Sequence, residues 1–395
     1  MRTILLLLTT LAIATPAHAA GWRISGYTAL ESRLFPNDGP PPLSLPAGTA
    51  TSASHDTSQS AVLQPEFHTT WNDRRDAFTF VPFLRLDQRD DERTHFDIRE
   101  LTWLHAARTW ELRAGIRKVF WGVTESRHLV DIINQTDGVE NVDGEDKLGQ
   151  PMLNLALIQD WGTLDLFVLP YFRERTFPGQ DGRLRTVPRV DADRARFESA
   201  AGENHVDVAA RWSRFIGNWD IGVSHFHGTS REPRLALDLS VPGDLVLVPF
   251  YEQIDQTGLD VQYTKGSWLW KLETIYRSGE DDFLAATGGF EYTFYGIFDT
   301  AMDLGALVES LYDDRPDDPG TPFEDDMFIG FRLMLNDVQS TEALLGCISD
   351  LDTSARSCSA EASRRFGDSW VLSLEARAFM DIPEQDPLSS LRRDD

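Results

Sequence analysis

The sequence predicts an all-β fold, namely a transmembrane antiparallel β-barrel of about 16–18 strands. Segments of about ten residues recur in which apolar and polar side chains alternate, and residues 63–71, 206–213 and 329–336 are examples. After the N-terminal region, no apolar run approaches the about eighteen residues that a spanning helix needs. Aromatic residues gather at segment ends, as at 268–270 and 366–370, where a membrane barrel places its interfacial girdles.

Alternation of this kind also fits a soluble β-sandwich, in which the apolar face of each sheet covers a dry core. Two features favour the barrel. The inward sets carry charge on many segments, and a dry core does not tolerate unpaired charge. Short turns also alternate with long polar loops, which is the asymmetry between the two ends of an outer-membrane barrel.

Residues 1–19 have the pattern of a cleaved signal peptide. Arg2 is followed by an apolar run over residues 4–14, and Ala17 and Ala19 supply the small residues before the cleavage site. We therefore expect residues 20–395 to form the exported protein and to reside in the outer membrane of a Gram-negative cell. The formal net charge of −26 argues against a nucleic-acid partner, because phosphate binding needs a basic face.

The connections divide into two classes by length and composition. Short turns rich in Gly, Asn and Asp are expected at residues 72–75, 107–109, 160–162, 217–219, 265–267 and 366–369. Long loops are expected at residues 36–60, 123–150, 177–204, 229–251 and 313–326. No linker interrupts the strand rhythm, so a single domain is expected.

The alternating segments number about seventeen, whereas single-chain bacterial barrels have an even number of strands. One interpretation is an eighteen-stranded barrel whose last strand is absent from this sequence. The other is a sixteen-stranded barrel followed by a tail over residues 381–395.

The loop at residues 123–150 is the candidate constriction, because porins often fold one loop into the lumen. Its acidic candidates are Asp131, Asp137, Glu140, Asp143, Glu145 and Asp146. Arginines at inward strand positions are the pore-lining candidates, namely Arg85, Arg99, Arg113, Arg117, Arg173, Arg211, Arg277, Arg332 and Arg377. Opposed charges across a constriction select solutes by sign. In the alternative interpretation, these arginines form structural ion pairs with Asp87, Asp97, Asp207, Asp260, Glu273 and Glu375.

Three further features of the sequence could form sites. Cys347 and Cys358 flank an expected hairpin tip, so they either form a disulfide across it or remain free thiols. The acidic loop clusters match no calcium loop, and the His225 and His227 pair lacks further ligands, so no metal or cofactor is predicted. No Gly-x-Ser-x-Gly or His-Glu-x-x-His motif occurs, so we expect no catalytic residues and no enzyme activity.

Several motifs resemble a family of poorly characterised proteobacterial outer-membrane porin-like β-barrel proteins. The sequence RKVFWG at 117–122 leads into VDIINQTD at 130–137, which is similar to a Trp-Gly then Asp-Val-Asn-Pro-x-Asp pattern of that family. Gln135 stands where the family has proline. Further similarities lie at 147–152, 309–313, 336–337 and 364–368. The resemblance implies a barrel, the passage of solutes, and a final strand that continues beyond residue 395.

The function expected from these observations is a porin-like channel for passive diffusion of small solutes. The alternative is the outer-membrane component of an export system for apolar or lipid-like molecules, and an apolar lumen would favour it. The expected partners are outer-membrane lipid, lipopolysaccharide and small solutes. Assembly into a homo-oligomer stays open, because all strands carry apolar outer faces.

Overall fold

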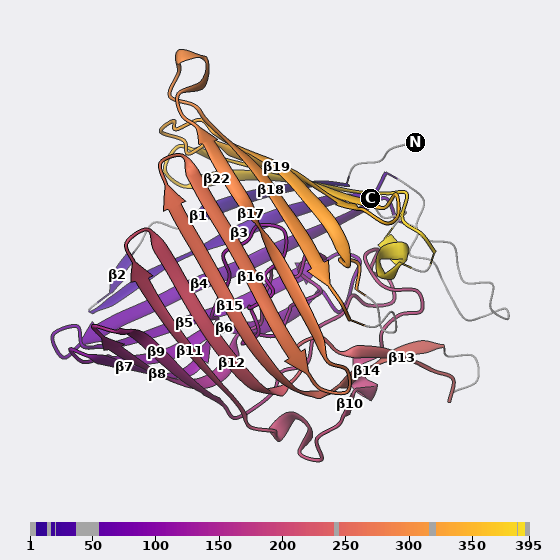
Figure 1. Cartoon of the computed structure of the whole chain (residues 1–395), viewed down its shortest axis with the longest axis horizontal. Coiled ribbons are helices and arrows are strands. Elements are labelled where there is room, and N and C mark those ends of the chain that lie inside the picture. Colours follow the sequence, from indigo (N-terminus) through magenta and orange to yellow (C-terminus); the bar gives the residue numbers. More distant parts are fainter. Residues whose placement is uncertain are drawn as a thin grey trace.

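The computed structural model describes residues 5–13, 17–19, 21–36, 55–240, 245–315, 321–384 and 386–391. In these residues it is an all-β protein dominated by one nineteen-stranded sheet (Figure 1). The strands of this sheet are β1 (Leu5–Ile13), β2 (Ala17–Ala19), β3 (Trp22–Leu34), β4 (Thr57–Trp71), β5 (Asp76–Asp87), β6 (His95–Ala106), β7 (Trp110–Arg117), β8 (Gln150–Gln159), β9 (Gly162–Leu169), β11 (Asp207–Ile216), β12 (Trp219–Thr229), β15 (Gln253–Lys265), β16 (Trp268–Ser278), β17 (Phe283–Phe294), β18 (Asp303–Asp313), β19 (Asp325–Met334), β20 (Glu342–Asp350), β21 (Arg356–Phe366) and β22 (Trp370–Met380).

A second, three-stranded sheet lies among the long loops. It consists of β10 (Arg196–Phe197), β13 (Arg234–Asp238) and β14 (Val246–Tyr251). The short 3₁₀ helices are η1 (Ala192–Arg194), η2 (Gly202–Asn204), η3 (Ile297–Asp299) and η4 (Pro387–Leu391). No helix in the described part of the chain is long and apolar enough to span a membrane.

The large sheet closes into a ring. From β3 to β22, each barrel strand pairs antiparallel with the next one along the chain, and β1 pairs antiparallel with both β22 and β3. Without β1 and β2, seventeen strands of the nineteen remain, which is the number predicted from the alternation. Closure leaves the strands of the ring without a free edge, as a spanning sheet requires.

Residues 1–19, the expected signal peptide, include β1, which lies between β22 and β3, and β2, which pairs with β3. The backbone of β1 pairs Leu8 with Leu374 on one side and with Ser32 on the other. β2 continues beside β3 and pairs His18 with Arg23. Residues 14–16, within this expected peptide, lie outside the described part of the chain, as do residues 392–395 of the expected tail.

Side chains on each strand alternate between an apolar outer face and a polar or buried inner face. On β16, Trp270, Leu272 and Tyr276 are exposed on the outside, whereas Glu273 and Arg277 are buried on the inside. Because successive side chains of a strand point to opposite faces, the two-residue period seen in the sequence becomes a lipid-facing band and a charged lumen.

The short turns lie at one end of the ring and the long loops at the other. Gly217 and Gly266 occupy turns with φ of 62°, a left-handed conformation in which glycine carries no steric cost. The turn after β4 instead uses three consecutive residues with positive φ, beginning at Asn72, a residue type that tolerates this region well. Tight turns at 72–75, 217–219 and 265–267 therefore lie where the sequence indicated.

Cys347 on β20 and Cys358 on β21 are direct cross-strand partners and form a disulfide with an S–S distance of 2.08 Å. The hairpin that they join belongs to the end with the long loops. The bond therefore links two adjacent strands close to their shared connection.

The orientation of the outer face can be tested with a matched pair of leucines. Leu272, at the middle of β16, is 41% exposed, and Leu284, near the start of β17, is 42% exposed. We expect Leu272→Arg to lower the free energy of unfolding by about 2–4 kcal/mol and Leu284→Arg by about 0–1 kcal/mol, because the cost of an arginine in lipid depends on depth. Urea unfolding in lipid vesicles measures both, and equal costs would contradict a membrane midplane at Leu272.

Candidate functional site

Residues 118–149, called here the inward loop, join β7 to β8 and lie inside the ring. Their contacts reach β16 and β18 on one wall, β5 and β6 on another, and β22 next to the closing position. The loop begins directly after β7 ends at Arg117, slightly earlier than the predicted range of 123–150. The inward loop therefore crosses the lumen and is attached to the wall at several positions around the ring.

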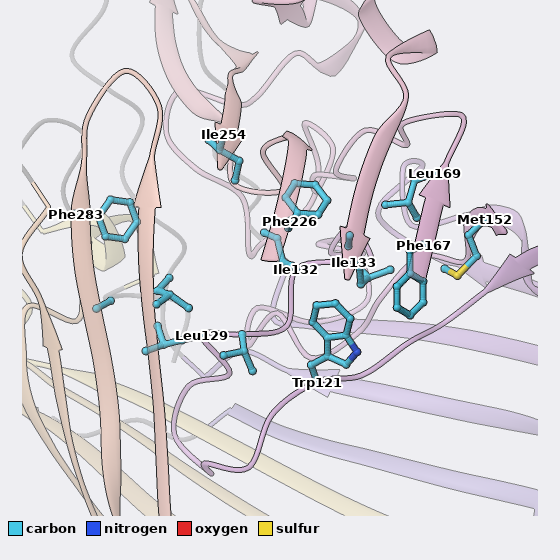
Figure 2. Packing of buried hydrophobic residues seen from close by; sticks show 14 residues of the cluster. Trp121, Leu129, Ile132, Ile133, Met152, Phe167, Leu169, Phe226, Ile254 and Phe283 are labelled. Carbon is cyan, nitrogen blue, oxygen red and sulfur yellow. The ribbon is translucent and has the colours of Figure 1, made fainter. Parts of the chain in front are cut away.

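One side of the inward loop packs on an apolar cluster inside the barrel. Trp121, Leu129, Ile132 and Ile133 of the loop contact buried residues of the wall, and Figure 2 shows Phe226 and Phe167 among these partners. All members are almost fully shielded from solvent. This packing fixes the loop against the β8–β17 side of the ring, because removing such apolar surface from water is favourable.

Two buried carboxylates hold the backbone of the loop. The Glu273 carboxylate on β16 accepts hydrogen bonds from the backbone N–H groups of Val123 at 2.6 Å, Thr124 at 3.0 Å and Val130 at 3.1 Å. The Thr124 hydroxyl donates another at 2.7 Å. Hydrogen bonds to a buried charge are the strong ones, so Glu273 anchors this turn of the loop.

Glu309 on β18 performs the same role for the following residues. Its carboxylate accepts the N–H groups of Glu125 at 2.9 Å and Ser126 at 2.8 Å, and the Ser126 hydroxyl at 2.6 Å. From the sequence, Glu273 is expected among the partners of arginines, and Glu309 enters only as the first residue of the motif at 309–313, without a role as an anchor. No local pattern could have indicated this role, because the contacts join residues far apart in the chain.

The distal part of the loop brings its predicted acids to the arginines of β5 and β6. The Arg85 guanidinium donates to Glu140 at 2.8 Å and to Glu31 of β3 at 2.9 Å. Arg99 donates to Asp137 at 2.6 Å and to Asp97 on its own strand at 2.9 Å. All these groups are buried, so the predicted opposition of acidic loop and basic wall takes the form of direct ion pairs.

Arg377 on β22 joins the loop to the third wall. Its guanidinium lies 2.6 Å from Asp143 of the loop, 2.6 Å from Glu375 and 3.8 Å from Glu361. Three carboxylates thus surround one cation, which gives this side of the lumen an acidic excess. The Asn141 amide also donates to Glu375 at 3.0 Å.

The other three predicted acids lie on the loop with different partners. Asp131 accepts the Trp121 N–H at 3.3 Å and lies 3.6 Å from Lys147; burial raises its pKa to about 6, although Lys147 acts in the opposite direction. Glu145 lies 3.3 Å from His128. The carboxylate of Asp146 has no ion pair among the described residues, and burial together with the charge of Glu140 raises its pKa to about 6.

The remaining predicted arginines are distributed around the ring. Arg113 and Arg117 on β7 both donate to Asn154 of β8, and Arg113 also pairs with Glu111. Ion pairs at 2.6 to 2.8 Å also join Arg211 to Asp260, Arg277 to Glu232 and Arg332 to Glu125.

Arg173 corrects one prediction, since it does not occupy a strand. β9 ends at Leu169, and the following Pro170 cannot donate to the sheet ladder. Arg173 instead lies in the segment after β9 and donates to Gly149 O at 2.8 Å and to Asp97 at 2.9 Å. It thereby fixes the end of the inward loop.

One group of side chains has the composition of a metal site. The ligand atoms of His95, Asp137 and Glu140 all lie within 4.8 Å of one another. The same carboxylates are bound by Arg99 and Arg85, however. A cation would have to displace two guanidinium groups, so the arrangement is better suited to holding the loop than to binding a metal.

A closed antiparallel ring with an apolar outer face, a charged lumen and one inward loop is the porin type of outer-membrane β-barrel. No protein-family model matches the sequence, and no curated protein matches it. Solved structures of similar architecture include the trimer form of OmpT from Vibrio cholerae, with 9% identity, 96% of this chain and 99% of that chain covered, and a TM-score of 0.45.

Two other solved structures are similar to this chain at a comparable level. OccK8 (OprE) of Pseudomonas aeruginosa has 11% identity, coverage of 96% of this chain and 98% of that chain, and a TM-score of 0.45. The channel DcaP of Acinetobacter baumannii has 10% identity, coverage of 96% of each chain and a TM-score of 0.40. Likeness at this level assigns no substrate and no residue roles to the present chain.

The anchoring role of Glu273 can be tested by removing its carboxylate. We expect Glu273→Ala to release residues 123–130 and to speed trypsin cleavage after Arg127 by at least about tenfold, since several hydrogen bonds to a buried charge are lost. Glu291→Ala is the control, because this inward carboxylate of β17 contacts Arg332 at 3.7 Å and no loop residue among those described. Equal cleavage of both variants would contradict the anchor.

Proposed function

We propose that this protein is a porin-like channel of the outer membrane that lets small hydrophilic solutes diffuse through a lumen narrowed by the inward loop. The observation that carries the proposal is the loop itself, which is held across a charged lumen by buried anchors on opposite walls. A ring of this many strands is wide enough to enclose water, and a fixed loop then determines the remaining passage.

The surface beyond the loop supports an aqueous path. Glu111 and Arg113 on β7 and Arg211 on β11 are inward side chains that remain partly exposed. Charges that are neither buried nor lipid-facing are stable only where water reaches them. The half of the lumen nearer the short turns is therefore suited to hydrated solutes.

The same features disfavour export of apolar molecules. Inside the ring, the large apolar cluster is covered by the inward loop, and its members, such as Ile133 and Phe226, expose almost no surface. An apolar solute would meet charged side chains on β3, β5, β6 and β22 in the described part of the lumen. Its transfer from lipid to such a surface is unfavourable.

The proposed location is the outer membrane, with lipid and lipopolysaccharide against the apolar outer face. The pattern of residues 1–19, with the small residues Ala17 and Ala19 before the cleavage site, leads us to propose that β1 and β2 are removed from the exported protein, so that β1 no longer lies between β22 and β3. We expect mass spectrometry of protein isolated from outer-membrane fractions to give Ala20 as the first residue. Protein that retains residues 1–19 in that fraction would contradict the processing.

Channel activity is tested by conductance of the refolded full-length protein in a planar bilayer under a salt gradient. We expect stable open steps with a non-zero reversal potential, because charged side chains line the passage. Glu273→Ala should give larger or noisier steps, since it loosens the loop, whereas Glu291→Ala should not enlarge them. A folded barrel that stays silent would overturn the proposed function.

A further inference from the structure

A cluster of arginines surrounds one glutamate at the end of the lumen with the long loops. Glu232 follows β12, and three cations converge near it from different elements: Arg127 of the inward loop, Arg277 of β16 and Arg315 after β18. We call these three arginines and Asp313 the Glu232 seat. None of the contacts with Arg127, Arg315 or Asp313 was expected from the sequence.

The distances show which cation belongs to which carboxylate. Arg277 lies 2.8 Å and Arg315 lies 3.4 Å from Glu232. Arg127 lies 3.0 Å and Arg315 lies 2.8 Å from Asp313. Three guanidinium groups therefore share two carboxylates. Partial removal of the Glu232 carboxylate from water acts to raise its pKa, but the three arginines hold it well below its ordinary value.

The two carboxylates differ in accessibility. Asp313 is completely buried, whereas the Glu232 side chain is 47% exposed. The arginines have supports besides Glu232, because Arg315 and Arg277 lie over the ring of Phe283 at 4.4 and 5.2 Å from its centroid, and Phe283 belongs to the apolar cluster of Figure 2. The three arginines thus have contacts that do not depend on the Glu232 carboxylate.

A fourth cation lies within electrostatic range. Burial lowers the pKa of Arg175, and the charge of Glu232 acts to raise it again. The Arg175 Nε is buried without a hydrogen-bond partner, and its guanidinium has no ion pair among the described residues. The guanidinium lies 5.7 Å from the ring centroid of Phe177, and the Arg175 backbone N–H donates to the Tyr251 hydroxyl at 3.0 Å. A partly buried guanidinium without an ion pair among the described residues favours an additional anion in this region.

We propose that the Glu232 seat binds the carboxylate group of a small organic acid in place of the Glu232 side chain. The planar fork of each arginine suits a carboxylate geometrically, and the present occupant is itself a carboxylate. The inference that such acids are taken up rests on the channel function proposed above. The inference that the Glu232 seat binds a carboxylate rests only on the contacts described here.

Benzoate binding to the refolded protein in detergent, measured by calorimetry at constant ionic strength, tests the site. We expect Glu232→Gln to bind benzoate about tenfold more tightly, because the competing internal carboxylate is gone. Glu280→Gln is the matched control, since this exposed glutamate contacts Arg234 at 3.4 Å outside the seat. It should leave the affinity unchanged.

The opposite change provides a second measurement. Arg315→Gln should weaken benzoate binding by about tenfold or more, whereas Arg234→Gln, an arginine that also pairs with several carboxylates, should not. Heat-modifiable migration on gels verifies that each variant is folded. If Arg315→Gln does not fold, Glu232→Gln alone decides.

The results separate this proposal from the channel function. Tighter binding by Glu232→Gln in a barrel that conducts no ions would support the seat and overturn the channel. A conducting barrel in which Glu232→Gln and Glu280→Gln bind benzoate equally would support the channel and overturn the seat. If no variant binds benzoate, the proposed Glu232 seat is also overturned.

Discussion

Each polar backbone group of a strand in lipid needs a partner on a neighbouring strand, and the rest of this structure depends on that requirement. It closes the sheet into a ring and fixes a two-residue side-chain period. With leucine and aromatic side chains outside, the charged residues of the same strands have no place other than the lumen. Glu273 and Arg277 of β16 show this clearly, since Leu272 and Tyr276 occupy the opposite face.

A lumen filled with charge creates a second requirement, because buried ions need partners. The inward loop supplies them in two chemically distinct ways. Near Glu273 and Glu309 it offers backbone amides and hydroxyls to acids of the wall. Near Arg85 and Arg99 it offers its own carboxylates to cations. One loop thus neutralises opposite signs on opposite walls, and this explains why it is both charged and attached to several strands.

The sequence predicted the fold well because alternation and turn residues are local properties. The seventeen ring strands between β3 and β22 inclusive, without β10, β13 and β14, and the tight turns follow from these local properties. The charge pairing of the lumen could be predicted less well from the sequence. Asp137 and Glu140 were placed on the loop correctly, but the amide-bound role of Glu309 joins residues far apart in the chain, and such contacts leave no periodic signal. Arg173 was predicted on a strand, but β9 ends at Leu169, because the following Pro170 has no backbone N–H to donate to the ladder.

The attachments of the inward loop also have a mechanical consequence. Hydrogen bonds between strands fix the spacing of neighbours but not the outline of a wide ring, which can flatten without breaking them. The loop connects β16 and β18 with β5, β6 and β22. These attachments oppose any change in the distance between the opposite walls of the ring. We expect the outline of the ring to resist lateral tension in the bilayer, which tension-dependent conductance would reveal.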